Sequence, residues 1–303
     1  LLIVGDDRQL PPIVNGVYPD PPPGQPRLQR SIFEALREGD RGRERITCLL
    51  YENFRMNEVL CAFPAACLYG AGYQSVDDAV GKRRINLATT RKAVPDWLKA
   101  VLSPAHPWTL AVLDGVQATN ENRTEAERVA EVAVTLRQRL LNERTGKPWP
   151  DTEAGDRDFW RHGLFIVSPH HAQLRAIRAA LAARGLRPPF FADTVDKMQG
   201  QECQTVIVSY GVADVEYALR EAGFIYSLNR LNVAVTRAQA KCVVFLPRPL
   251  LEPALEALEI PGAAEGIAFM RALFEHVRGE MGWEGELENG GKLTVYRGSQ
   301  MPV

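Results

Sequence analysis

The chain has 303 residues, a formal net charge of −1, 46% hydrophobic residues and 24% charged residues. This balance is typical of a globular protein with about two domains, and it excludes a disordered, collagen-like or disulfide-stapled chain. No apolar run approaches the roughly 18 residues that span a bilayer and no signal-peptide pattern is visible, so we expect neither a membrane protein nor an exported one. The five cysteines are scattered without a CxxC pair, which favours reduced thiols in a cytoplasmic protein.

Charge is unevenly distributed behind this nearly neutral sum. Residues 161–250 carry 11 basic and 6 acidic side chains, whereas residues 251–303 carry 4 basic and 9 acidic ones. If the basic middle faces phosphates, binding to nucleic acid should weaken steeply with salt. We expect the acidic end to be a solvated tail with Trp283 buried, and a partner surface is the alternative.

The apolar run 1–4 predicts a short core strand that ends at the turn of Gly5. Because a domain rarely begins inside such a strand, we expect the chain to be cut upstream of it. A proline-rich surface loop is expected at 19–26, since proline lacks the N–H that a helix or a strand ladder needs. A helix should start at Ser31, which has capping-box spacing to Glu34.

The rest of the chain predicts a parallel sheet. A strand at 46–51 and a helix at 57–69, interrupted at Pro64 and ended by Gly70, precede the stretch 73–107, which shows no clear period. Short apolar strands then alternate with helices, and the expected elements are strands 110–113, 164–167, 205–208 and 241–245 and helices 125–141 and 173–183. This alternation is typical of βαβ units.

Two early strings carry candidate chemistry. GDDRQLPP follows the first strand, and the carboxyl ends of parallel strands face the crevice where α/β proteins bind ligands. Its Asp6 and Gln9 are therefore placed to meet a phosphate-bound metal or water, although its two prolines also suit a plain polar turn. In NFRM, Arg55 lies among apolar residues and needs an anion, either a carboxylate of the fold or a ligand in a cleft.

Two late strings carry further candidates. In DTVDKMQGQE, Gly200 allows a close backbone approach to a phosphate, and Glu202 can accept a hydrogen bond from a ribose hydroxyl. A plain hydrophilic loop is the alternative. In NRLNVAVTRA, helical spacing puts Arg230 and Arg237 on one face, where guanidinium groups suit a triphosphate. A salt-bridged helix is the alternative there.

In this order, the four strings resemble the later motifs of superfamily 1 helicases: motif III, the arginine-bearing motif before the second RecA-like domain, motif V and motif VI. Lesser matches at 31–36, 63–70, 122–126 and 165–173 are similar to the superfamily 1B branch, which includes the nonsense-mediated-decay helicase and the Okazaki-fragment nuclease-helicase. The resemblance covers roughly residues 1–250. It implies an α/β fold, with a RecA-like parallel sheet and helices on both faces, as in the second domain of P-loop NTPases.

The resemblance also implies domain boundaries and roles. A truncated remnant of the first RecA-like domain would occupy 1–46, the second RecA-like domain 47–251 and an acidic extension 252–303. Gln9 would sense the γ-phosphate and Asp6 would support the magnesium and water network. Arg55 and Arg237 would act as arginine fingers. The remaining roles are nucleotide contacts for Gly200, Glu202 and Arg230, and contacts to the nucleic-acid backbone for Ser168, Gln173 and Thr194.

The sequence also departs from the family pattern. No GxxxxGK[ST] loop and no Asp-Glu pair before motif III occur, so we expect the main ligands of ATP and Mg²⁺ in a missing first domain. The chain alone should not hydrolyse ATP. Asn229 stands where many relatives have a second arginine. We expect no metal site, because His170 and His171 suit a surface turn better than a ligand pair, and nuclease carboxylates are not recognisable.

We therefore expect the carboxyl-terminal part of an ATP-dependent helicase or translocase. The resemblance implies 5′ to 3′ movement on single-stranded DNA, with RNA as the alternative within the class. A nucleic-acid-binding or regulatory module that has lost its ATPase half is the alternative from another class. The expected partners are a single nucleic-acid strand and the first RecA-like domain, without a membrane.

Overall fold

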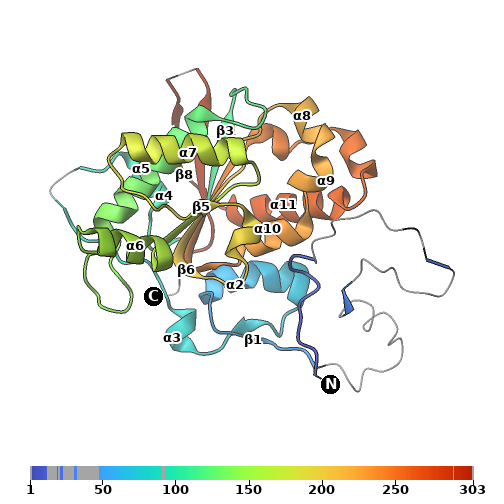
Figure 1. Ribbon diagram of the computed structural model, residues 1–303, viewed down its shortest axis with the longest axis horizontal. Helices are drawn as coiled ribbons and strands as arrows, with labels where there is room; N and C mark the ends of the chain where they lie inside the picture. Colours follow the sequence, from blue (N-terminus) through green and yellow to red (C-terminus); the bar gives the residue numbers. More distant parts are fainter. Residues whose placement is uncertain are drawn as a thin grey trace.

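The computed structural model describes residues 2–11, 19, 21–22, 31–32, 48–90, 93–288 and 290–301. At its centre is a seven-stranded sheet in the order β5-β4-β6-β7-β3-β9-β8 (Figure 1). The first five strands of this order run parallel to one another. The last two come from the end of the chain: β9 pairs antiparallel with β3, and β8 pairs antiparallel with β9. The parallel sheet predicted by the strand-helix alternation is confirmed.

The strand bounds are β3 Trp108–Asp114, β4 Leu164–Val167, β5 Ala192–Asp193, β6 Cys203–Ser209, β7 Ala238–Pro247, β8 Glu280–Glu286 and β9 Lys292–Arg297. Two short strands, β1 Glu52–Asn53 and β2 Gln74–Ser75, pair in parallel apart from this sheet. Every residue of β4 and β6 is buried, as expected of strands covered on both faces.

Helices cover both faces of the sheet, as expected for a RecA-like domain (Figure 1). One face packs against α4 Asp96–Val101, α5 Arg123–Arg139, α6 Glu153–His162 and α7 His171–Ala183. The other packs against α2 Glu58–Pro64, α10 Leu228–Val235 and α11 Ala263–Val277. Along β3, Leu110 and Val112 belong to one core and Ala111 and Leu113 to the other, because side chains alternate along a strand.

Shorter elements complete the described part of the chain. They are α3 Asp78–Gly81, α8 Val215–Arg220 and α9 Ala222–Ile225, with the 3₁₀ turns η2 Val195–Met198, η3 Arg248–Leu250 and η4 Leu255–Glu259. The helices α3, α4, α6, α8, α9 and α11 have no counterpart among the predicted elements. No helix in the described residues is long and apolar enough to cross a bilayer.

The predicted break at Pro64 is confirmed and has a structural consequence. Proline has no N–H to donate, and the chain continues beyond α2 as the π-helix η1 (Ala65–Tyr69). Gly70 ends it with φ +86°, and its N–H donates to the carbonyl of Ala65, five residues earlier, at 2.8 Å. The wider turn sets where the side chain of Tyr69 points.

Two predicted strands are wrong. Residues 2–4 form no strand, and Leu2 and Val4 are 88% and 76% exposed, because no described strand lies beside them to complete a ladder. Residues 48–51 are also without strand structure, and the strand of this region is β1 instead. The predicted proline-rich loop and the helix from Ser31 lie mostly outside the described residues.

The expectation of a solvated acidic tail is also wrong. Strand β9 pairs antiparallel with β3, β8 pairs with β9, and α11 packs into the core. Leu293 and Val295 of β9 are buried, and Trp283 of β8 is partly buried against the same core. The acidic residues of β8 alternate with residues that face inward, so composition alone conceals a strand.

Candidate nucleotide site and nucleic-acid interface

Gln9 and Arg237 meet although they lie far apart in the sequence. Arg237 is 2% exposed, and its Nη2 donates to Oε1 of Gln9 at 2.8 Å. Helix α10 ends at Val235, so Arg237 lies beyond the helix and its Nε donates back to the carbonyl of Val233 at 3.3 Å. Burial, with a smaller contribution from the nearby Arg55, lowers the pKa of Arg237 to about 10.

Arg55 and Glu202 form a second contact beside the first. Nε of Arg55 donates to Oε2 of Glu202 at 2.9 Å, and its Nη1 donates to the carbonyl of Thr236 at 3.0 Å. The side chains of Arg55 and Glu202 are 26% and 47% exposed, so solvent and ligands can reach the pair. Nε2 of Gln239 donates to the same carboxylate at 3.2 Å.

These contacts place Gln9, Arg237, Arg55 and Glu202 in one row, which we call the finger cluster. Among the described residues no carboxylate lies within ion-pair distance of Arg237, whose side-chain partner is the neutral amide of Gln9. A nearly buried cation without a carboxylate fits an anionic ligand, since an unpaired buried charge is costly. The cluster can therefore accept the phosphates of a nucleotide.

The loop that carries Gln9 is held by its own Asp6 and by side chains of two elements, η1 and α10. Oδ2 of Asp6 accepts from Nε2 of Gln9 at 2.8 Å and from the hydroxyl of Tyr69 at 2.9 Å. Nδ2 of Asn232 donates to the Tyr69 hydroxyl at 2.7 Å and to the carbonyl of Arg8 at 2.8 Å. Asn229 donates to the carbonyl of Gln9. Helix α10 therefore contacts the loop directly, through residues on its face toward Gln9.

Tyr69 and Asn232 were missed by the sequence reasoning. Tyr69 reaches Asp6 from η1, which turns more widely than an α-helix. Pro64 indicated a break in the helix, but it did not indicate where the side chain of Tyr69 would point. Asn232 lies inside the recognised string NRLNVAVTRA, yet an Asn in a helix has no spacing signal of its own. Asn229, noted as a departure from arginine, contributes through its amide instead.

The predicted site residues Gly200, Arg230 and Thr194 lie outside the finger cluster. Gly200 has φ +78° and nothing within 4 Å of a built Cβ, so the turn before Glu202 is open. Arg230 faces Asp196 at 3.9 Å and lies over the ring of Phe224 at 4.7 Å. Arg230 and Arg237 therefore do not share a face, because the helix ends between them. Thr194 is half-buried and precedes η2.

Ser168 and Gln173 are fully buried, and the polar atoms of the Gln173 side chain are already hydrogen-bonded within the fold. Oε1 of Gln173 accepts from the backbone N–H of Asn122 at 2.7 Å, and its Nε2 donates to Oγ of Ser209 at 3.0 Å. Ser209 in turn donates to Oε1 of Glu125 at 2.6 Å. We call Asn122, Glu125, Gln173 and Ser209 the cap network, because it surrounds the first turn of α5.

Glu125 is the acidic residue of the cap network, and its pKa is strongly raised. It is fully buried, and it accepts from Ser209 and from the N–H of Gly211 at 3.0 Å. Burial raises the pKa of Glu125 to about 8, and these hydrogen bonds offset only part of the rise. The group therefore carries a proton over most of the range below pH 8, which suits a sealed interior.

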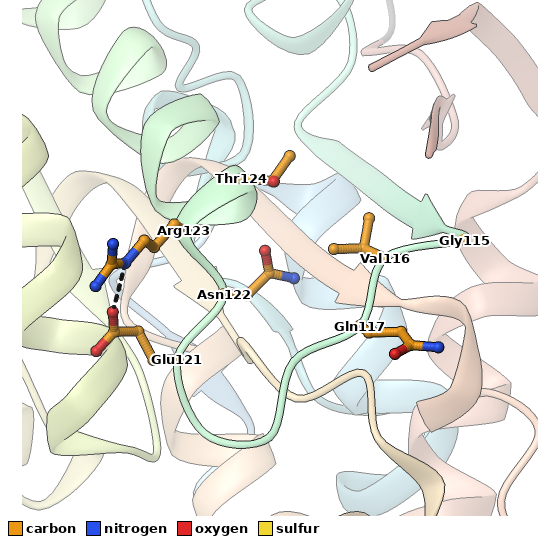
Figure 2. A pocket seen from close by; sticks show the side chains of 7 residues that line it. All are labelled: Gly115, Val116, Gln117, Glu121, Asn122, Arg123 and Thr124. Atoms are coloured by element: carbon orange, nitrogen blue, oxygen red, sulfur yellow. Dashed lines mark hydrogen bonds and ion pairs between the residues drawn. The ribbon is translucent and has the colours of Figure 1, made fainter. Parts of the chain in front are cut away.

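A pocket of about 460 Å³ lies beside the cap network (Figure 2). It is lined by 115–117, at the carboxyl end of β3, and by 121–124, at the start of α5. Figure 2 shows Glu121 and Arg123 paired on one side, at 2.9 Å, while Asn122 points toward Val116 and Gln117 on the other. A small polar ligand fits this space.

The described residues contain no group of three or more side chains able to hold a metal ion. Asp6 is the nearest carboxylate to the finger cluster, and Gln9 and Tyr69 already donate to it. These residues do not make a magnesium site by themselves. What they offer is an array of donors, in which Arg237, Arg55 and the Gln9 amide converge from segments that are far apart in the sequence.

Comparison with known proteins agrees with this arrangement. The family described as "AAA domain" matches residues 28–246. The mouse (Mus musculus) 3′-5′ exoribonuclease HELZ2 is 25% identical over 80% of this chain and 8% of its own length. The Xenopus laevis DNA replication ATP-dependent helicase/nuclease DNA2 is 25% identical over 80% of this chain and 22% of its own length.

The Schizosaccharomyces pombe DNA polymerase alpha-associated DNA helicase A is 24% identical over 80% of this chain and 33% of its own length. The chain thus spans between 8% and 33% of the length of these three relatives. The family match covers most of the chain, and it includes Arg55, Glu202 and Arg237 of the finger cluster. The chain therefore belongs to this AAA domain family, as a helicase region of the superfamily 1B type.

Proposed function

We propose that the chain is the second motor domain of an ATP-dependent helicase or translocase. The observation that carries the proposal is the finger cluster, in which a nearly buried Arg237, with no carboxylate partner among the described residues, meets Gln9 from the GDDRQLPP loop. Motors of this kind place ATP between two RecA-like domains, and arginine fingers from one domain stabilise charge on the phosphates held by the other. The main ligands of ATP and Mg²⁺ would then belong to the first domain.

The residues of the finger cluster divide the work by their chemistry. Bound ATP supplies the phosphoanhydride bond that is cleaved. Arg237 and Arg55 would neutralise charge that develops on the γ-phosphate, because a planar guanidinium stays charged and donates in a fixed fork. The side chain of Gln9 would lie beside the same phosphate, because its Nε2 donates to Oδ2 of Asp6 at 2.8 Å and is held in place. Glu202 would accept from the nucleotide sugar.

Two predicted site residues fit the nucleotide role less directly. Gly200, at an open turn with φ +78°, would let backbone N–H groups approach a phosphate. Arg230 would contact nucleotide only after leaving Asp196, to which it lies at 3.9 Å. We propose that Gly200 shapes the loop before Glu202 and that the contribution of Arg230 to turnover is the smaller of the two arginines in its string.

We propose that the second substrate is a single nucleic-acid strand, DNA in preference to RNA, followed 5′ to 3′. The family relation and the basic stretch 161–250 support a phosphate-rich partner. Two of the relatives above are named DNA helicases and one an exoribonuclease, so their names favour DNA only by number. Thr194, half-buried after β5, is the predicted backbone contact that remains accessible.

All five cysteines are unpaired in the structure, and three of them are buried. Free thiols persist where the surroundings are reducing. We propose a cytoplasmic location for the protein on this ground.

The test is ATP hydrolysis by the full-length protein that contains this chain, with and without oligo(dT) or oligo(U). We expect turnover stimulated by a single strand. In Arg237→Ala it should fall about 10³- to 10⁵-fold, which is the range for an arginine finger. Arg230→Ala is the matched control, because its guanidinium lies outside the finger cluster, and we expect less than about a tenfold loss.

No stimulated turnover in the wild-type protein would contradict the motor. If the same protein still bound oligo(dT) with strong salt dependence, the second candidate, a nucleic-acid-binding module without ATPase activity, would replace it. The sequence observation that favours this candidate is the lack of a GxxxxGK[ST] loop in the 303 residues.

A further inference from the structure

The first turn of α5 presents an unused donor to the pocket beside it. Asn122 is the N-cap of this helix, and its Oδ1 accepts from the N–H of Glu125 at 3.0 Å. Its side chain is 2% exposed, yet Nδ2 has no hydrogen-bond acceptor among the described residues. A buried donor without an acceptor is unfavourable unless a ligand or a water completes it.

The side chain of Gln173 fixes the backbone of Asn122 and so the orientation of its amide. Oε1 of Gln173 accepts from the backbone N–H of Asn122 at 2.7 Å, and Nε2 of Gln173 donates to the carbonyl of Asn122 at 3.3 Å. Gly211, with φ +69°, lies so close to Gln173 that a Cβ there would be 2.6 Å from Cδ. Because Oδ1 is occupied by the helix cap, Nδ2 is left to face Val116 and Gln117 across the pocket (Figure 2).

The surroundings of Nδ2 select an anion. Helix α5 has 17 residues, and the start of a helix carries the positive end of its dipole. Gln117 is exposed and adds a second amide from the facing side of the pocket. Glu121, the acid among the residues that line the pocket, is paired with Arg123 and turns away from Gln117 (Figure 2). A group with several acceptor oxygens and negative charge fits these donors.

We propose that this pocket binds a phosphodiester group of the single nucleic-acid strand, through Nδ2 of Asn122 and the amide of Gln117. The inference deepens the proposed function and rests on it. It reassigns Gln173 from direct contact to a positioning residue that acts through Asn122. The pocket lies at the carboxyl end of β3, which runs parallel to β4, β5 and β6. Thr194 follows β5 at the same edge of the sheet, so a nucleic-acid strand bound along this edge also passes Thr194.

The experiment measures binding of the whole chain to fluorescent oligo(dT) and oligo(U) by anisotropy at several salt concentrations. Asn122→Ser keeps an N-cap oxygen and removes only the amide, so the helix should remain capped. We expect its Kd to rise about tenfold, equally for different base sequences, with an unchanged salt slope because no charge is lost. The two strands distinguish a DNA backbone from an RNA backbone.

Two further variants separate binding from folding. Gln117→Ala lies in an exposed position and should weaken binding about threefold without changing the urea midpoint of unfolding. Thr152→Ser changes the N-cap of α6, whose hydroxyl accepts from the N–H of Gly155 at 3.1 Å and which does not line the pocket. This matched cap control should bind both strands as the wild type does.

Two outcomes would overturn the site, and they differ in what else they overturn. If the wild-type chain binds both strands but Asn122→Ser and Gln117→Ala bind equally well, the phosphate contact lies elsewhere and the proposed function stands. If the wild-type chain binds neither strand at any salt concentration, the nucleic-acid half of the proposed function fails together with the site.

Discussion

The finger cluster and the cap network are built in opposite ways. The finger cluster draws on segments near residues 9, 55, 202 and 237, and its Arg55 and Glu202 remain partly exposed. The cap network is sealed, with Glu125, Gln173 and Ser209 all fully buried and hydrogen-bonded to one another. Arg55 and Glu202, which we propose exchange their pair for a ligand, are left within reach of solvent, whereas Arg237 and the groups of the cap network are enclosed.

The variant Arg55→Ala in the full-length protein tests this contrast between the two regions most directly. Arg55 holds Glu202 and the carbonyl of Thr236, and we propose that it turns toward phosphate when ATP binds. Turnover should fall about 10³-fold, while the free energy of unfolding changes little, since the residue is partly exposed. Arg144→Ala removes a surface pair with Asp158 at 3.4 Å and should leave turnover unchanged.

Gly211→Ala tests how rigid the cap network is. The new Cβ would lie 2.6 Å from Cδ of Gln173, on a backbone with φ +69°, so strain and overpacking add. We expect a loss of about 2–4 kcal/mol in the free energy of unfolding, measured with urea. Gly185→Ala is the matched control: its φ is +80° with nothing within 4 Å, so it should cost only about 1 kcal/mol. Equal losses in both variants would show that Gln173 can move aside.

Glu125→Gln should change how the stability of the chain depends on pH. The folded pKa of Glu125, about 8, lies above its ordinary value of 4.5, so the folded chain holds a proton that the unfolded chain releases between these values. The free energy of unfolding therefore falls as pH rises through this window, by at most about 1.4 kcal/mol per pH unit. The glutamine keeps the acceptor for Ser209 without that proton.

Urea unfolding at several pH values between about 5 and 8 measures this difference between wild type and variant. We expect the free energy of unfolding of the variant to increase relative to that of the wild type as pH rises. Burial lowers the pKa of Lys241 to about 7, which raises stability with pH above that value, but both proteins carry this lysine and its effect cancels. Parallel profiles would mean that Glu125 is ionised in the fold.

The smallest expected effect on stability belongs to Glu202→Ala. Its pair with Arg55 is partly exposed, so its loss should cost less than about 1 kcal/mol. The KM for ATP should nevertheless rise several-fold in the full-length protein, because Glu202 is proposed to bind the sugar. Asp78→Ala, which removes the exposed pair with Lys82 at 2.8 Å, should leave KM unchanged. Equal KM values in all three proteins would remove Glu202 from the nucleotide site.

The parts of the fold that the sequence predicted are those with local signals. Strands β4 and β6 are continuous apolar runs, and α5 has a clear helical period, so each could be placed within a few residues. The hairpin β8–β9 gave no such signal, because β8 has no buried residue and its register shifts between Met281 and Trp283, and because β3, the partner of β9, lies far away in the chain.

The site shows the same limit. Gln9 and Arg237 are 228 positions apart, and no spacing rule connects them, so only the family resemblance placed them together. Gln173 follows a buried strand, where a polar side chain can face either a ligand or the fold. Its partner Asn122, 51 positions away, decides between the two. The end of α10 before Arg237 likewise could not be located from an apolar run that continues into β7.

The central claim is that Gln9 and Arg237 act on ATP as one unit, and a double-mutant cycle tests it most directly. ATP turnover stimulated by oligo(dT) is measured for the full-length wild type, Gln9→Ala, Arg237→Ala and the double variant. The 2.8 Å contact predicts that the double variant is about as slow as Arg237→Ala alone, because residues that act together lose their effect once. If the two losses multiply instead, the residues work independently and the account is contradicted.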